Sequence, residues 1–180
     1  FNLPIIKMSE FNKTPTPSQG SNVPKLGIFT GGGIVKGQLL DYFKTGIINV
    51  HMGNLPHYKG MDVVHAPIMD GKIKNVGITS HLMDKSIDTG DVIQHFFIDD
   101  PKNFRNIGVL RNTLAAIMPL MAIDSLCGIS SGRIIPKPQI SSRSRMHYYL
   151  HPRLRISIEN SIRANYSPNK HETLRLKKIY

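Results

Sequence analysis

The sequence predicts an α/β fold in which neighbouring strands pair in parallel. A short apolar run at 26–30 is followed by a glycine turn, a helix-like stretch and a second apolar run at 47–51. This order of strand, loop, helix and strand is the repeating unit of α/β proteins. The 180 residues are 40% hydrophobic and 19% charged, which suits a globular domain with a substantial core.

Each further element follows from a local pattern. The prolines and serine of 14–20 predict a loop, because proline fixes φ and removes a donor. Apolar side chains four residues apart, at Leu154, Ile158 and Ile162, predict an amphipathic helix. In chain order we expect a strand at 26–30, a helix at 35–42, a strand at 47–51, a helix at 62–69, strands at 76–83 and 92–98, a helix at 105–126 broken or bent near Pro119, a strand at 133–136 and a helix at 152–163.

Polar side chains end two of the expected strands. Side chains at i and i+2 of a strand point to the same face, so Asn49 and His51 should lie side by side. Asp88 follows the run at 76–83 in a turn-forming Asp-Thr-Gly-Asp sequence, which delivers a carboxylate at a strand end. Taken singly, the three could serve only structure, as a strand-end cap, a core histidine and a turn residue.

Together these groups suit acyl or formyl transfer to an amine. Asn49 can donate to a developing oxyanion, His51 can accept a proton near neutral pH, and a carboxylate can orient the ring. No protein nucleophile is evident, so the amino group of the substrate would attack. Asp84 and Asp91 compete with Asp88 for the carboxylate role, and the chemistry alone does not choose among them.

The segments 49–60, 78–79 and 87–91 resemble, in order and separation, the formyltransferase family that uses 10-formyltetrahydrofolate. The shared pattern is an Asn-x-His pair, a Leu-Pro loop with a basic residue and a glycine, and a later Asp-x-Gly turn. The resemblance implies Asn49, His51 and Asp88 as the catalytic residues. It implies a folate pocket lined by the backbone at Gly33, Ile34 and Val35 and closed by the loop that holds Asp84 and Ile87.

The glycines at 31–33 are compatible with two alternatives to a folate pocket. One is a tight turn that binds no ligand. The second is a dinucleotide fingerprint, which the sequence disfavours because the Gly-x-Gly-x-x-Gly spacing and a suitably placed acidic residue are both missing.

The resemblance also implies a Rossmann-like formyltransferase fold, with a mainly parallel twisted sheet and flanking helices. The first strand-helix units of that fold are expected to be missing, which would leave an apolar sheet edge exposed. We divide the chain into a leading strand and Pro/Ser-rich loop at 1–25, a catalytic core at 26–140 and a basic helical segment and tail at 141–180.

The expected function is formyl transfer from 10-formyltetrahydrofolate to a nucleotide-linked amino sugar. Gly53 and the stretch 60–64 are similar to the nucleotide-sugar branch of the family. Only about forty residues follow the expected strand at 133–136, which argues against the tRNA enzyme. One alternative is a truncated, catalytically silent member that binds folate or a phosphate-bearing partner. Methionyl-tRNA or purine-pathway transfer is a further one.

Composition bounds the partners. The formal net charge is +11, and much of the excess of basic residues lies late in the chain. These residues either attract a phosphate-bearing substrate or form a solvated helix face and tail. Nucleic-acid binding ranks last, because no aromatic RNA-reading motif accompanies the basic residues. The histidine spacings form no familiar metal-ligand set, and we expect no metal. Cys127 is expected in the core. No apolar run reaches the length of a membrane span. We expect a cytoplasmic location and a homodimer.

Overall fold

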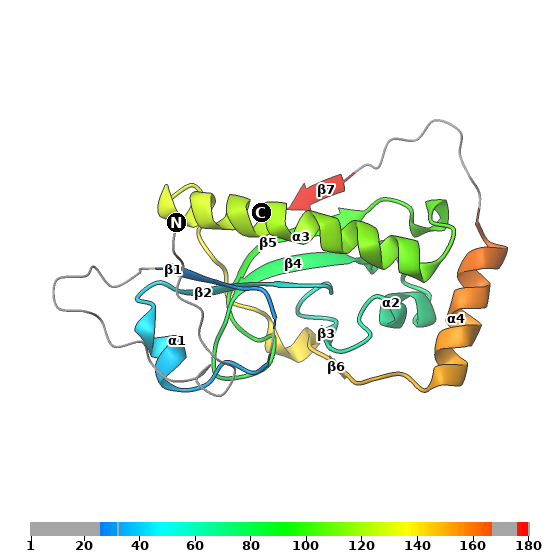
Figure 1. Ribbon diagram of the computed structural model, residues 1–180, viewed down its shortest axis with the longest axis horizontal. Coiled ribbons are helices and arrows are strands. Elements are labelled where there is room, and N and C mark those ends of the chain that lie inside the picture. Colours follow the sequence, from blue (N-terminus) through cyan, green and yellow to red (C-terminus); the bar gives the residue numbers. More distant parts are fainter. Residues whose placement is uncertain (1–25, 32, 167–175, 180) are drawn as a thin grey trace, which may run out of the picture.

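The computed structural model describes residues 26–31, 33–166 and 176–179. The described strands form a five-stranded sheet in the order β1-β2-β4-β5-β7 and a two-stranded sheet of β3 and β6 (Figure 1). The strands are β1 (Leu26–Phe29), β2 (Gly46–His51), β3 (Lys59–Gly60), β4 (Gly77–Leu82), β5 (Val92–Ile98), β6 (Met146–His147) and β7 (Leu176–Ile179). The helices are α1 (Gln38–Tyr42), α2 (His65–Met69), α3 (Ile107–Ser130) and α4 (Pro152–Ala164), with single 3-10 turns η2 (Ile73–Asn75), η3 (Pro101–Asn103) and η4 (Ser141–Arg143). The expected leading strand and the loop at 14–20 lie outside the described residues.

The α/β class is confirmed, but the expectation of a mainly parallel sheet is wrong for the described strands. Within the five-stranded sheet only β1 and β2 pair in parallel, while β2-β4, β4-β5 and β5-β7 are antiparallel; the two short strands β3 and β6 form a separate parallel pair. The short loop 83–91 joins β4 to β5, and a connection of that length joins antiparallel neighbours, since a parallel crossover needs a dozen residues or more. The sheet is therefore mixed.

The expected strand at 133–136 is replaced by a single bridge. Lys137 exchanges two backbone hydrogen bonds with Val92, each 2.8 Å long. Pro136 and Pro138 flank this residue, and proline cannot donate to a ladder, so the pairing stops there. The edge strand β7, by contrast, was not expected from the sequence.

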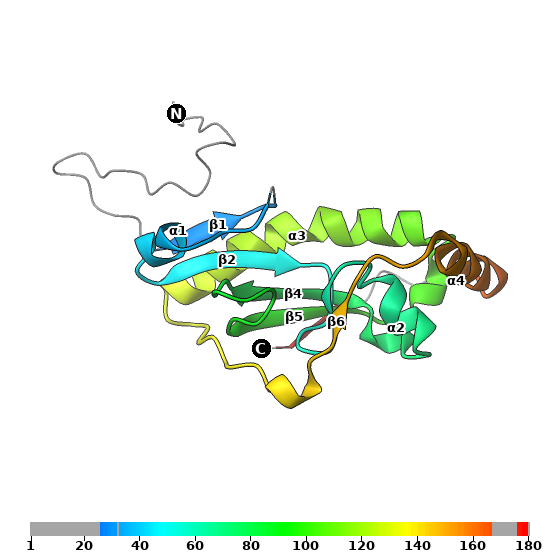
Figure 2. The same ribbon diagram turned by 90° about the horizontal axis from the view of Figure 1, so that it is seen from below.

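Helix α3 packs along one face of the sheet and makes the main core with it (Figures 1 and 2). Val50 of β2 and Leu110 of α3 are both buried in this core. A buried polar network crosses the same interface. Ser80 Oγ lies 2.7 Å from Ser125 Oγ, and Gln94 Nε2 donates to Ser125 Oγ at 2.8 Å.

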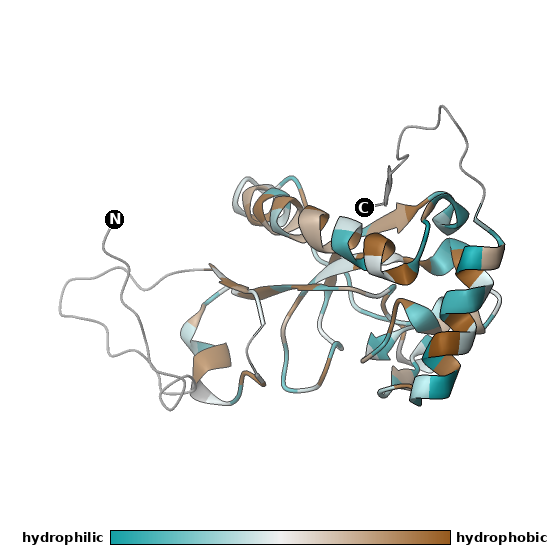
Figure 3. Ribbon diagram, turned by 45° about the vertical axis from the view of Figure 1, so that its right-hand side comes forward, coloured by the Kyte–Doolittle hydropathy of each residue, from teal (hydrophilic) through white to brown (hydrophobic). Residues whose placement is uncertain are grey.

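A break or a bend was expected near Pro119, and α3 is not broken there, since one helix runs continuously through this residue. Cys127 is exposed on this helix, which corrects its expected place in the core. By length and composition α3 is apolar enough to cross a membrane, although no run of that length was expected from the sequence; core helices of soluble proteins can share this property. Figure 3 shows hydrophobic colour along the central strands and much of α3.

Candidate active site

The polar face of the sheet carries the candidate site, on the side away from the α3 core. Asn49 and His51 lie on β2 with the spacing of two that places both side chains on one face. The antiparallel register sets His81 opposite Asn49 and Thr79 opposite His51. Four polar side chains from two strands therefore share one surface.

Asp88 completes this group from the loop 83–91. Its Oδ2 lies 3.4 Å from His51 Nδ1, and its Oδ1 lies 3.6 Å from His81 Nε2. The backbone N–H of Gly60 donates to Oδ2 at 2.9 Å. Asp88 has a φ of 55°, in the left-handed region that aspartate tolerates better than most residues. One carboxylate thus lies between two imidazoles.

Of the three competing carboxylates, Asp88 is the one that faces the histidines. Asp84 Oδ1 instead accepts from the Ser86 N–H at 3.0 Å and from the Thr89 hydroxyl at 2.6 Å, an arrangement that shapes the loop. Asp91 holds the hairpin through its carbonyl, which accepts from the Leu82 N–H at 2.8 Å. The geometry agrees with the choice of Asp88 that the resemblance implied.

The His51 ring is placed to take a proton. Its Nε2 lies 3.0 Å from the Tyr58 carbonyl, an acceptor only, so Nε2 carries a proton. In the neutral ring Nδ1 then presents a lone pair towards Asp88. Burial lowers the pKa of His51, although Asp88 and the Tyr58 carbonyl favour the charged form. The ring is therefore neutral at neutral pH, and a proton gained at Nδ1 would be held beside a carboxylate.

Asp88 keeps its charge in this setting. Burial alone would raise its pKa, but the nearby His81, the electrostatic interaction with the His51 ring and the Gly60 N–H together lower the pKa below the ordinary value. The carboxylate is therefore ionised at neutral pH and can stabilise an imidazolium.

The Asn49 amide is held by His81. His81 Nδ1 lies 2.8 Å from the Leu82 carbonyl and so donates to it, which leaves Nε2 as the acceptor for the Asn49 Nδ2, 3.1 Å away. An amide nitrogen carries two hydrogens, and this contact uses one. The second has no acceptor among the described residues and can donate to an oxygen bound at the site.

Sequence reasoning missed three residues around this group. His81 had no assigned role in the site, yet its register with Asn49 follows once β2 and β4 are paired. Thr79 lay within the segments that carry the resemblance but had no assigned role, and Gln139 had no sequence signal. Gln139 Nε2 donates to the carbonyls of Asp88 (3.1 Å) and Gly90 (2.7 Å) and so anchors the loop that carries the carboxylate.

Gly53 has a direct geometric role. A Cβ at this position would lie 2.7 Å from His51 Nε2 and 2.7 Å from the Tyr58 carbonyl. The absence of a side chain allows the carbonyl and the ring to meet.

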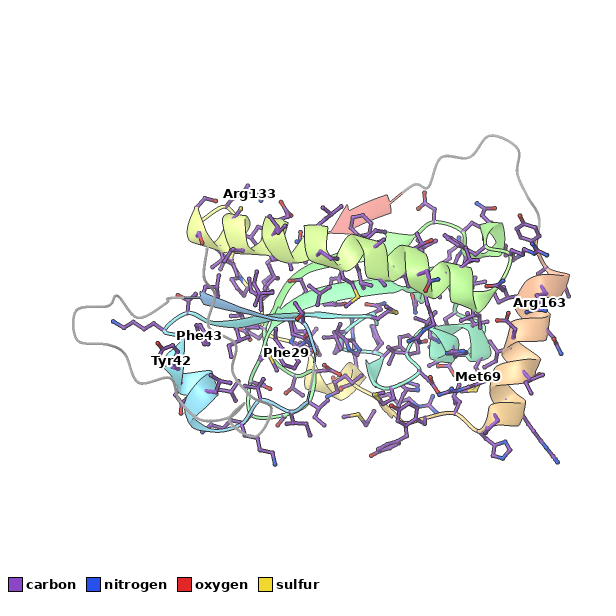
Figure 4. The ribbon with its side chains drawn as sticks, viewed as in Figure 1. Phe29, Tyr42, Phe43, Met69, Arg133 and Arg163 are labelled. Atoms are coloured by element: carbon purple, nitrogen blue, oxygen red, sulfur yellow. The ribbon has the colours of Figure 1, made fainter. Side chains whose placement is uncertain are left out.

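The structure does not gather the predicted folate residues into a described cavity. Val35 is buried, whereas Gly33 and Asp84 are exposed and the side chains of Ile34 and Ile87 are 58% and 50% exposed. An apolar cavity of about 350 Å³ lies instead between β1, β2 and α3, with Phe29, Asn49 and Met118 in its wall. Figure 4 labels Phe29 near this end of β1. Across the described ranges, no three His, Cys, Asp or Glu side chains are placed to hold a metal ion.

Part of the chain is similar in sequence to known formyltransferases. Residues 32–99 match the family model described as "Formyl transferase". The methionyl-tRNA formyltransferase of Heliobacterium modesticaldum is 32% identical over 114 residues, which cover 63% of this chain and 35% of the relative. That of Syntrophomonas wolfei is 31% identical over 140 residues, covering 69% and 44%. The chain thus spans less than half the length of these relatives.

Solved structures share the fold. The formyltransferase PseJ from Anoxybacillus kamchatkensis, in complex with UDP-4,6-dideoxy-4-formamido-L-AltNAc and tetrahydrofolate, has a TM-score of 0.59 at 21% identity, covering 76% of this chain and 71% of that one. The methionyl-tRNA formyltransferase from Clostridium thermocellum has a TM-score of 0.53 at 20% identity, covering 72% and 53%. The family match over residues 32–99, together with the sequence relatives, places this segment of the chain in the formyltransferase family, and the two solved structures share its fold.

Proposed function

We propose that this protein transfers a formyl group from 10-formyltetrahydrofolate to the amine of a second substrate. The observation that carries the proposal is the cluster on the polar face of the sheet: an amide donor at Asn49, a neutral imidazole at His51 and a carboxylate at Asp88, 3.4 Å from that ring. These are the groups that attack by an amine on a formyl carbon requires.

The roles follow from the chemistry of the transfer. The amine nitrogen bonds to the formyl carbon, and negative charge develops on the formyl oxygen, where the free N–H of Asn49 donates. The attacking nitrogen gives up a proton, which His51 Nδ1 takes with Asp88 beside it. The bond from the formyl carbon to N10 of the folate then breaks, and N10 gains one proton. The proton lost by the amine therefore balances the proton gained by the leaving folate.

For the amine we favour an amino sugar carried on a nucleotide. PseJ, whose fold this chain shares, was solved with a UDP-linked formamido sugar and tetrahydrofolate. Gly33, Ile34, Val35, Asp84 and Ile87 remain our proposed contacts to the folate. The initiator methionyl-tRNA is the second candidate, because the sequence relatives at 31–32% identity are methionyl-tRNA formyltransferases.

The test is turnover of the full chain with 10-formyltetrahydrofolate and a panel of amines, with the formylated product measured by mass spectrometry. The panel contains UDP- and dTDP-linked amino sugars, the corresponding free amino sugars and methionyl-tRNA. We expect formylation of a nucleotide-linked sugar, and a fall in kcat/KM of about 10²-fold or more in His51→Ala. His151→Ala, which removes an exposed histidine from the start of α4, should leave turnover unchanged.

Two results would contradict the proposal. If the turnover of His51→Ala lies within a few-fold of that of the parent, the imidazole does not accept the proton in the reaction. Binding of a stable 10-formyltetrahydrofolate analogue with no transfer to any amine would instead identify a catalytically silent family member.

A further inference from the structure

A second depression lies beyond the candidate site, between the end of β3, the first turn of α3 and α4. It has a volume of about 860 Å³, within the range of small-molecule sites. Its walls include Met61 and Asp62 after β3, Asn106 to Gly108 at the start of α3, and arginines from α3 and α4. We call it the arginine cavity. Figure 4 labels Arg163 on α4, at the end of the molecule away from Tyr42 and Phe43.

The charges of the arginine cavity leave one positive charge uncompensated. Three arginines and two carboxylates line it. Arg155 Nη2 is paired with Asp62 Oδ2 at 2.6 Å, and Arg163 Nε with Glu159 Oε1 at 3.1 Å. Among the described residues Arg111 has no carboxylate within ion-pair distance, and its side chain is exposed. A charged fork without a partner at the wall of a cavity favours an anion.

The backbone at the start of α3 adds to this preference. The Ile107 N–H donates to Glu159 Oε2 at 3.0 Å and the Val109 N–H to Asn106 Oδ1 at 2.8 Å. Within the described chain the N–H of Gly108 has no acceptor, and this residue has no side chain to cover it. The amino end of a 24-residue helix therefore turns a bare donor and its partial positive charge to the cavity wall.

A buried histidine and an exposed ring complete the walls. His65 is only 9% exposed and its Nδ1 makes no hydrogen bond within the described structure, the nearest carboxylate oxygen, on Asp62, being 3.9 Å away. Tyr149 is 70% exposed, and the Arg155 guanidinium lies 5.7 Å from its ring centroid. A flat aromatic group at the rim offers a stacking surface for a planar base.

The arginine cavity is close to the candidate site along the chain. Gly60, whose N–H donates to Asp88, is two residues from Asp62, which lines the cavity. Two residues span at most roughly 7 Å. The wall of the cavity at Asp62 is therefore close to the Gly60 N–H that holds the Asp88 carboxylate.

We propose that the arginine cavity binds the diphosphate of a nucleoside diphosphate, with Arg111 as the main phosphate contact and Tyr149 beneath the base. If that nucleotide is the carrier of the amino sugar, the inference rests on the proposed function and locates the nucleotide part of the substrate in the arginine cavity. A small nucleotide fits better than an RNA backbone, because Asp62 and Glu159 stand among the arginines and would repel a continuous run of phosphates.

The test is calorimetric titration of the full chain with UDP, uridine and inorganic pyrophosphate. We expect UDP to bind, uridine to bind far more weakly, and pyrophosphate to bind with part of the affinity of UDP. Arg111→Ala should weaken UDP about tenfold, the size of one charge-assisted contact. Arg143→Ala removes the same charge outside the cavity and should leave UDP binding unchanged.

The inference is overturned if UDP does not bind, if Arg111→Ala and Arg143→Ala bind it alike, or if only tRNA binds and does so equally in both variants. The nucleotide site and the proposed formyl transfer can fail independently of each other. If UDP binding depends on Arg111 but no formyl transfer is found, the nucleotide site is supported and the proposed transferase activity is contradicted. If the protein formylates a sugar nucleotide and Arg111→Ala does not change that activity, the proposed function is supported and the nucleotide site is contradicted.

Discussion

At the scale of single residues, Thr79 holds the strand face that presents His51. Its hydroxyl donates to the Gly53 carbonyl at 2.7 Å, so its lone pairs receive the Leu55 N–H at 3.1 Å and the His95 Nδ1–H at 3.0 Å. The side chain is fully buried. Thr79→Val would leave three buried polar groups without their hydrogen-bond partner: the Gly53 carbonyl, the Leu55 N–H and the His95 ring.

We expect Thr79→Val to lower the free energy of unfolding by about 2–3 kcal/mol, the cost of unsatisfied buried groups. Urea denaturation measures the change. Thr113→Val makes the matched substitution in α3, where the hydroxyl bonds only the Val109 carbonyl in an exposed setting, and should cost less than about 0.5 kcal/mol. Equal losses in the two variants would show that Thr79 is no anchor.

His95 gives the protein a pH dependence. Burial, with a smaller effect of the charge of His57, lowers the pKa of His95 to about 4. The unfolded state, with a pKa near 6.5, binds the proton more readily, so stability is present above about pH 6.5 and is lost as the pH falls towards about 4. The full difference in pKa corresponds to about 3 kcal/mol.

His95→Asn should flatten this part of the curve, because an amide can still donate to Thr79 but does not titrate. The measurement is the free energy of unfolding at pH 7 and at pH 4.5 for both proteins. His151→Asn, at an exposed helix cap, is the control and should keep the slope of the parent. An unchanged slope in His95→Asn would assign the dependence to other groups.

The residues of the site were predictable where they share one strand and not where two segments meet. Strand alternation alone placed Asn49 beside His51. His81 entered only through the pairing of β2 with β4, a register that one strand's sequence does not contain. The position of Asp88 between both rings depends on the fold of loop 83–91, so only the resemblance separated it from Asp84 and Asp91.

At the scale of elements, the hairpin of β4 and β5 depends on Gly90. An added Cβ there would overlap the Leu82 carbonyl. We expect Gly90→Ala to cost about 3 kcal/mol or more, or to prevent folding. Gly71→Ala, at a φ of 69° in open space, should cost only about 1 kcal/mol. Thermal unfolding followed by circular dichroism compares them, and equal costs would mean that the loop adjusts freely.

Gln139 controls the same loop from the segment after α3. Gln139→Leu removes its two bonds to the carbonyls of Asp88 and Gly90. We expect faster amide hydrogen exchange across residues 83–91, with the exchange of β2 unchanged, because only the loop loses partners. The neighbouring Ile140→Ala, at a side chain that is 56% exposed, should not alter exchange. Unchanged protection of the loop in Gln139→Leu would exclude the anchoring role.

Elements with a strong local pattern were predicted closely, and those defined by pairing were not. The helix expected at 152–163 is observed at Pro152–Ala164, and the strand expected at 92–98 at Val92–Ile98. The expected strand at 133–136 failed because prolines on both sides of Lys137 limit pairing to one bridge. Strand direction depends on how connections fold back, which periodicity does not encode.

At the scale of the whole molecule, α3 turns apolar side chains to both sides. Leu120 is 67% exposed and Ile123 is 55% exposed, while Leu110 and Leu114 are fully buried. Among the described strands β1 is a sheet edge, and Ile28 on it is 41% exposed. Exposed apolar surface of this kind promotes association.

We therefore expect the chain to self-associate as its concentration rises, and Leu120→Glu with Ile123→Glu to shift it towards the monomer. Sedimentation velocity at several concentrations measures this. Met69→Glu, at a 41% exposed position on α2, should have no effect on mass. A parent that stays monomeric at all concentrations would contradict the expectation.

The two faces of the sheet make the molecule intolerant of one kind of genetic change. Neighbouring residues of β2 serve opposite purposes, since Val50 packs under α3 while Asn49 and His51 face the candidate site. Deleting or inserting a single codon within β2 would exchange these faces, moving an imidazole into the core and a valine into the candidate site. Among homologous chains we expect length variation to fall in the loops and to spare codons 46–51 and 77–82.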